Sequence, residues 1–167
     1  WRAGLAGRAN SGSLIFFALI DIMTKKILVT GASGFIGSHT CVELLAAGFD
    51  VVAVDNLCNS AREAMARVER IAGTSVPFYA ADVRDRAAMA AILREHAIDA
   101  VIHFAGLKSV GESVAQPLRY MDNNVTGTVA RLEVLAAANV KRFVFSSSAT
   151  VYGDPEALPI VETSRLS

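Results

Sequence analysis

Three glycines stand where the first apolar run of the chain ends. The run Ile27–Thr30 is followed directly by Gly31, Gly34 and Gly37, in the pattern G-x-x-G-x-x-G. A glycine turn that leads from a strand into a helix lets a pyrophosphate approach the backbone closely, and the start of the helix offers it unpaired amide groups. Glycine triplets also occur in ordinary turns. The motif therefore indicates a phosphate-binding turn only if the next strand supports it.

An acidic residue at the end of the second apolar run gives that support. Asp55 closes the run Val51–Asp55 and lies eighteen positions after Gly37. In the dinucleotide-binding fingerprint, such a carboxylate accepts hydrogen bonds from both ribose hydroxyls of an adenosine. A ribose 2′-phosphate would meet like charge there, so Asp55 favours NAD over NADP. In the alternative interpretation, Asp55 merely begins a turn with Asn56.

Three consecutive hydroxyl groups follow the last apolar run. Ser146, Ser147 and Ser148 come directly after Phe143–Phe145. A serine hydroxyl stays protonated near neutral pH and takes part in catalysis only when a partner activates it. Ser146 and Ser147 can equally satisfy backbone groups where a strand ends. The serine run is thus a candidate for one part of an active site, and its partner must be sought elsewhere.

The elements that would position these residues follow from the apolar pattern after Lys26. Strand-like runs alternate with helical segments, and most runs are apolar throughout, as expected for a parallel sheet covered on both faces. The predicted strands comprise residues 27–30, 51–55, 77–81, 100–104 and 142–146. Alternating units of this length predict an α/β fold with a doubly wound parallel sheet and right-handed crossovers.

Apolar spacing also predicts which helix faces contact the sheet. The first stripe, after a cap at Asp85, comprises Met89, Ile92, Leu93 and His96. The second stripe comprises Val125, Val129, Leu132 and Leu135. Because the members of each stripe recur at helical spacing, we expect both stripes to face the sheet. Gly48 and Asn139 tolerate the left-handed conformation that ends a helix, so both are predicted helix ends.

Composition limits the classes of function. The chain has 167 residues, of which 53% are apolar, and it carries 16 basic and 16 acidic side chains. Its length fits one domain, and its formal net charge of zero gives no support to nucleic-acid or membrane binding. Cys41 and Cys58 have neither the spacing of a metal site nor the number for a disulfide framework. We therefore expect reduced thiols, no bound metal and a cytoplasmic location.

The first 22 residues differ from the rest. They contain a stretch rich in glycine, alanine and arginine and then the apolar run Leu14–Ile20, which is far shorter than the roughly 20 residues that cross a bilayer. No small-residue cleavage site follows, and Met23 stands immediately ahead of the first strand. We therefore expect residues 1–22 to be a non-native or disordered extension, and residues 23–167 to form an incomplete NAD-binding Rossmann domain.

Five motifs together carry a resemblance to a known family. In chain order they are VTGASGFIGSHTCVELL, DNLCNS, VIHFAGLKSVGESV, DNNVTGT and FSSSATVYGD. From Lys25 to Glu162 the chain closely resembles the UDP-glucose 4-epimerases, a family of extended short-chain dehydrogenases/reductases. The resemblance implies NAD-dependent interconversion of UDP-glucose and UDP-galactose, by oxidation and re-reduction at C4 of the sugar, in galactose metabolism. It also implies a homodimer for the full-length enzyme.

The same resemblance implies a set of site residues. Phe35 and Ile36 would lie beside the pyrophosphate, residues 55–60 would hold the adenosine ribose, and residues 82–83 would flank the adenine. Residues 104–108 and Asn123 would line the nicotinamide half, and Ser148 matches the active-site hydroxyl. The implied cofactor-binding residues are Gly31, Gly34, Phe35, Ile36, Gly37, Asp55, Asn56, Leu57, Cys58, Asn59, Ser60, Asp82, Val83, Phe104, Ala105, Gly106, Leu107, Lys108 and Asn123.

The base that the resemblance implies is not found in the chain. In the family, a tyrosine with a lysine four residues later removes the proton from the sugar hydroxyl, because the ammonium favours the phenolate. A positioned base of this kind is typically worth about 10²- to 10⁴-fold in rate. None of Tyr79, Tyr120 and Tyr152 has a lysine four positions on. We therefore expect a truncated chain that is inactive alone and lacks the base, the last strands and the sugar-binding domain.

Two other functions fit the same motifs. One is another nucleotide-sugar epimerase or dehydratase of the same family, and the other is a non-enzymatic NAD-binding module. A Tyr-x-x-x-Lys pair encoded after residue 167 would favour an enzyme, whereas a genuine stop codon there would favour the module.

Overall fold

A five-stranded parallel sheet forms the centre of the protein. The structure is a computed structural model that describes residues 26–155 and 157–166. The strands are β1 (Lys26–Thr30), β2 (Asp50–Asp55), β3 (Phe78–Ala80), β4 (Ala100–His103) and β5 (Arg142–Phe145). Their order in the sheet is β3-β2-β1-β4-β5, and every pair is parallel. The chain order reverses at β1, which confirms the predicted doubly wound sheet. The extension expected at residues 1–22 lies outside the described residues.

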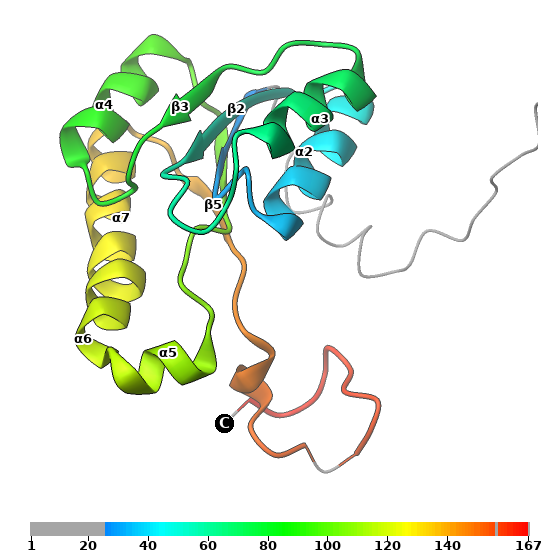
Figure 1. Ribbon diagram of the computed structural model, residues 1–167, viewed down its shortest axis with the longest axis vertical. Helices are drawn as coiled ribbons and strands as arrows, with labels where there is room; N and C mark the ends of the chain where they lie inside the picture. Colours follow the sequence, from blue (N-terminus) through cyan, green and yellow to red (C-terminus); the bar gives the residue numbers. More distant parts are fainter. Residues whose placement is uncertain (1–25, 156, 167) are drawn as a thin grey trace, which may run out of the picture.

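Helices cover both faces of this sheet. They are α2 (Phe35–Ala46), α3 (Glu63–Ala72), α4 (Arg86–Glu95), α5 (Val110–Ala115), α6 (Pro117–Tyr120) and α7 (Gly127–Ala137), with a π-helix η1 (Met121–Thr126) and a 3₁₀-helix η2 (Ala149–Tyr152). In Figure 1, α2 and α3 lie on one face, and α4 and α7 lie on the other. Among the described residues, no helix combines the length and the apolar character needed to cross a membrane.

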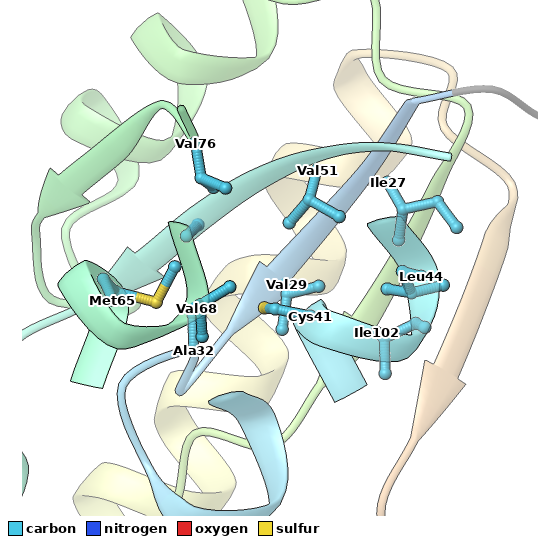
Figure 2. Close-up of a cluster of buried hydrophobic side chains, with 11 residues drawn as sticks. Ile27, Val29, Ala32, Cys41, Leu44, Val51, Met65, Val68, Val76 and Ile102 are labelled. Atoms are coloured by element: carbon cyan, nitrogen blue, oxygen red, sulfur yellow. The ribbon is translucent and has the colours of Figure 1, made fainter. Parts of the chain in front are cut away.

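Each face of the sheet has its own apolar core, because successive side chains of a strand point to opposite faces. Ile27 and Val29 of β1 contribute to the cluster under α2 and α3, which Figure 2 shows together with Leu44 and Val68. Leu28, which lies between them, contributes to the cluster under α4 and α7. All three β1 side chains are fully buried, and each such burial stabilises the fold by about 1.5–3 kcal/mol. The sheet that carries the strand ends is therefore held from both sides.

The ends of the helices agree with the sequence at most positions. The Asp85 carboxylate accepts hydrogen bonds from the amides of Ala87 and Ala88, so the predicted cap of α4 is confirmed. Gly48 and Asn139 have φ values of 86° and 56°, which confirms both as left-handed helix ends. His96 is an exception, because α4 ends at Glu95. The His96 side chain instead contacts the Tyr79 hydroxyl, with Nε2 at 2.6 Å from the oxygen.

The predicted inner face of α7 is wrong. Of its apolar stripe only Leu135 is buried, whereas Val125, Val129 and Leu132 are between 44% and 51% exposed. The buried face comprises Gly127, Ala130, Arg131, Val134 and Leu135. Gly127 is required to be small at this face, because a Cβ atom on it would lie 3.1 Å from Cγ of Arg84. The helix carries apolar side chains on two faces, and the face that contains Gly127, Ala130 and Val134 approaches the rest of the fold.

Candidate functional site

A pocket of about 280 Å³ lies at the carboxyl ends of the strands. Of the residues implied by the motifs to bind the cofactor, all line the pocket except Leu57, Ser60 and Asp82. Ala81 and Ser146 also line it, although the resemblance gave them no role there. Each of these two residues directly follows the last residue of a strand, β3 and β5 respectively. Ser146 belongs to the serine run that the sequence marked as a candidate, and the rule that ligands bind at the carboxyl ends of parallel strands was the signal that could have found Ala81.

The glycine turn after β1 forms one wall, and its backbone approaches other backbone very closely. Gly31 has a φ of +70°, and a Cβ atom on it would lie 2.6 Å from the amide nitrogen of Ala105. A Cβ atom on Gly37 would lie 2.1 Å from the Gly31 carbonyl oxygen. Both positions therefore require glycine for steric reasons. The helix α2 begins at this turn with no side-chain cap, so its first amides are directed to the pocket end of the turn.

Asp55 at the end of β2 forms the second wall, and the chain around it is built to hold its carboxylate. The residue is only 6% exposed, so its charge needs hydrogen-bond partners. Oδ2 accepts from the Ser33 amide at 2.9 Å. Oδ1 accepts from the Leu57 amide and the Ser60 hydroxyl, both at 2.8 Å. Leu57 and Ser60 thus lie behind Asp55 rather than in the pocket, and they orient it.

The third wall is the segment after β4, and Asn124 holds it in place. The Asn124 side chain accepts from the Leu107 amide and donates to the Leu107 carbonyl oxygen, each at 2.9 Å. The neighbouring Asn123 donates to the Asn124 side-chain oxygen at 2.9 Å and lines the pocket. Lys108 also lines the pocket and brings a positive charge to it. The π-helix η1, which contains both asparagines, therefore fixes the wall that carries this cation.

His103 lies at the end of β4, next to the wall-forming segment, and is only 2% exposed. Its Nδ1 is 2.5 Å from the Thr30 hydroxyl oxygen. Burial lowers the pKa of His103 to about 3, and the positive charges of Arg131 and Lys108 act in the same direction. The imidazole is therefore neutral at physiological pH, and it joins β4 to β1 rather than carrying charge.

Asp82 and Ser148, both implied by the resemblance to belong to the site, contact other parts of the chain. Both carboxylate oxygens of Asp82 accept hydrogen bonds from Arg84, and one also accepts from Asn56. The Arg84 guanidinium holds the pKa of the Asp82 carboxyl well below its usual range. Ser148 caps η2, where its Oγ accepts from the amide and the hydroxyl of Thr150. Neither Asp82 nor Ser148 lines the pocket, and the catalytic role of Ser148 stays a prediction.

Comparisons with known proteins agree with this geometry. The sequence profile of the family described as "NAD dependent epimerase/dehydratase family" matches residues 27–167. A UDP-glucose 4-epimerase of Klebsiella pneumoniae is 59% identical over 138 residues, which are 83% of this chain and 99% of that relative. A UDP-glucose 4-epimerase of Neisseria meningitidis serogroup C is 57% identical over 83% of this chain and 41% of the relative.

Solved structures give the same result in three dimensions. The UDP-glucose 4-epimerase of Bifidobacterium longum, solved with NAD⁺ and UDP, superposes with a TM-score of 0.82 at 53% identity. The alignment covers 86% of this chain and 43% of that structure. The chain thus spans about two fifths of the length of most such relatives. With a profile match over nearly all described residues and these identities, the chain belongs to the NAD dependent epimerase/dehydratase family.

Proposed function

We propose that this chain supplies the NAD-binding part of an enzyme that interconverts UDP-glucose and UDP-galactose. The observation that carries the proposal is the pocket between the glycine turn and Asp55. A turn that has no room for a Cβ atom at Gly37 suits a diphosphate lying against the backbone. The buried Asp55 carboxylate suits ribose hydroxyls and repels a 2′-phosphate. The residues present therefore fit NAD.

Each wall of the pocket would hold one part of the cofactor. The amides at the start of α2 would bind the pyrophosphate, and Asp55 would bind the adenosine ribose. Lys108 and Asn123 would contact the nicotinamide half at the other end. The group held there would supply hydride acceptance at C4 of the sugar while the hydroxyl proton passes to a base, and both would return in re-reduction, with the hydride on the opposite face. Because the same cofactor would be restored in each cycle, the net reaction would be an isomerisation.

The remaining parts of the proposal concern the whole enzyme. Ser148 would contribute a hydroxyl beside the sugar once a base is present. We propose that the base comes from sequence outside these 167 residues, because none of the three tyrosines has a lysine four positions on. UDP-glucose and UDP-galactose are the proposed partners, with a cytoplasmic location and a homodimer for the full-length enzyme. An assay of the full-length product on both sugar nucleotides, compared with other UDP-hexoses, tests the specificity.

Calorimetric titration of the chain with NAD and NADP tests the cofactor assignment. We expect NAD to bind more tightly than NADP. Asp55→Ala should weaken NAD binding by about 1.5–3 kcal/mol, the range for hydrogen bonds to a charged group. Asp50→Ala is the matched control, because Asp50 begins the same strand at its exposed end, far from the pocket lining. Equal NAD affinity in the wild-type chain and the Asp55→Ala variant would exclude the ribose assignment.

A further inference from the structure

Arg84 connects segments of the chain that are distant in sequence, although it does not itself line the pocket. Its amide and Nε donate to Asp82 Oδ1 at 2.8 and 3.0 Å, and its Nη2 donates to Asp82 Oδ2 at 2.8 Å. Its Nη1 donates to Asp122 Oδ2 at 2.5 Å. One guanidinium therefore holds two carboxylates, and these belong to the loop before α4 and to η1.

The first of these carboxylates leads to the adenosine end of the pocket. Asp82 Oδ2 also accepts from the Asn56 side-chain nitrogen at 3.1 Å. Asn56 lines the pocket and directly follows Asp55. Because Oδ2 of Asp82 accepts from both Arg84 and Asn56, Asp82 joins these two side chains and orients that of Asn56. Arg84 thereby fixes the position from which Asn56 is held.

The second carboxylate leads to the opposite end. Asp122 lies in η1, immediately before Asn123, which lines the pocket. The stem of Arg84 also lies against the start of α7, where a Cβ atom on Gly127 would be 3.1 Å from Arg84 Cγ. Glycine at this position leaves room for the Arg84 stem beside the helix. Arg84 is therefore held by its two carboxylate partners, with its stem beside the start of α7.

We infer that Arg84 is a positioning residue that holds the adenosine wall and the nicotinamide wall of the pocket at a fixed separation, so that one dinucleotide can contact both. The inference rests on the proposed function. Ion pairs at this degree of exposure contribute little to stability by themselves, and the side chains of Arg84 and Asp122 are 41% and 55% exposed. The effect should instead appear in binding, because pre-organising two subsites favours a ligand that spans them.

A comparison of NAD with AMP distinguishes this role from ordinary stabilisation. AMP occupies the adenosine end alone, whereas NAD needs both ends. Arg84→Met should weaken NAD binding about two- to fivefold more than it weakens AMP binding, which corresponds to the measured range for one exposed ion pair. Loss of folded protein would lower the number of sites for both ligands equally and would leave the ratio of the two affinities unchanged.

Two further variants complete the experiment, which uses calorimetry on the whole chain. Arg86→Met is the matched control, because Arg86 pairs with Glu133 at 2.7 Å, has 55% side-chain exposure and does not line the pocket. Asp122→Ala cuts only the arm to η1, so it should weaken NAD binding while AMP binding stays at the wild-type level. If Arg84→Met does not fold, Asp122→Ala alone decides.

The outcomes separate the two levels of the proposal. Failure of the wild-type chain to bind NAD would overturn the proposed function itself. The positioning role would be overturned by a different result. In that case the wild-type chain binds NAD, but the NAD-to-AMP affinity ratios of Arg84→Met and Asp122→Ala match that of Arg86→Met. The assignment of the cofactor site would then stand. A lowered NAD affinity with an unchanged AMP affinity in Asp122→Ala supports the positioning role of Arg84.

Discussion

Replacing Gly37 by alanine tests the closest backbone approach in the pocket, and two effects of opposite sign decide the result. Alanine favours a helix over glycine by about 1 kcal/mol, which would stabilise α2. The new Cβ atom would lie 2.1 Å from the Gly31 carbonyl oxygen and 2.9 Å from its carbonyl carbon. Ordinary carbon–oxygen contacts begin at about 3.3 Å, so the helix and the turn must separate by about 1 Å.

This separation should lower the free energy of unfolding, because backbone atoms on both sides have to move. Overpacking a well-filled site costs about 1–3 kcal/mol and sometimes more, and here the upper end applies. After the helix term is subtracted, we expect a net loss of about 2 kcal/mol, or a fall in Tm of about 4–8 °C for a domain of this size. NAD affinity should fall as well, since the displaced turn is the proposed pyrophosphate site.

Gly111→Ala is the matched control, because Gly111 lies in α5 and a Cβ atom on it would meet nothing within 4 Å. The same substitution should there be neutral or stabilising by up to about 1 kcal/mol. Urea unfolding followed by circular dichroism measures both variants, and calorimetry measures their NAD binding. If Gly37→Ala is as stable as Gly111→Ala, the turn is not packed as described and the reasoning from steric contact fails.

Three other expectations concern buried groups. Arg131 is 1% exposed, and its Nε and Nη1 have no hydrogen-bond partner among the described residues, so Arg131→Met should raise the free energy of unfolding by about 1–3 kcal/mol, measured in urea. Burial lowers the pKa of His103 to about 3, so below about pH 6.5 the unfolded chain binds a proton at this residue that the folded chain does not. The free energy of unfolding should therefore decline as the pH falls through this range. In NMR spectra of the folded chain, the imidazole signal should not titrate above pH 5. Burial raises the pKa of the Cys41 thiol to about 12, so a thiol reagent at pH 8 should label Cys58 quickly and Cys41 only on unfolding. Because Cys58 lines the pocket, NAD should slow its labelling. Equal labelling rates for the two thiols in the folded chain would contradict the described burial.

Local patterns were sufficient for the sheet, for the glycine turn and for Asp55, whereas most other pocket residues were implied by the resemblance. The strands are short apolar runs between turn residues, and each observed end lies within one residue of the predicted one. The glycine turn and Asp55 are fixed by their distance along the chain, since each must end a neighbouring strand. The pocket residues after β4 were accessible by the same logic, because the carboxyl ends of parallel strands meet at one edge.

Contacts between distant segments were not accessible in this way. Arg84 and Asp122 are separated by 38 positions, and no local pattern pairs them. The inner face of α7 was missed because it contains the buried Arg131, and apolar spacing gives a charged side chain no place on a buried face. The resemblance implied that Asp82 flanks the adenine, but no local pattern showed that the neighbouring guanidinium engages both of its oxygens.

The central position of β1 has a consequence for synthesis on the ribosome. β1 pairs with β4, and Thr30 reaches across to His103, a residue 73 positions later. A nascent chain that has released only the first three strands therefore exposes one unpaired edge of β1, whose residues Ile27–Val29 are fully buried in the folded protein, and this is a hazard for aggregation. Nicotinamide dinucleotide cannot protect this intermediate, because the segment from Phe104 to Lys108 has not yet left the exit tunnel. We expect chaperones, rather than the cofactor, to protect the chain until β4 has been released.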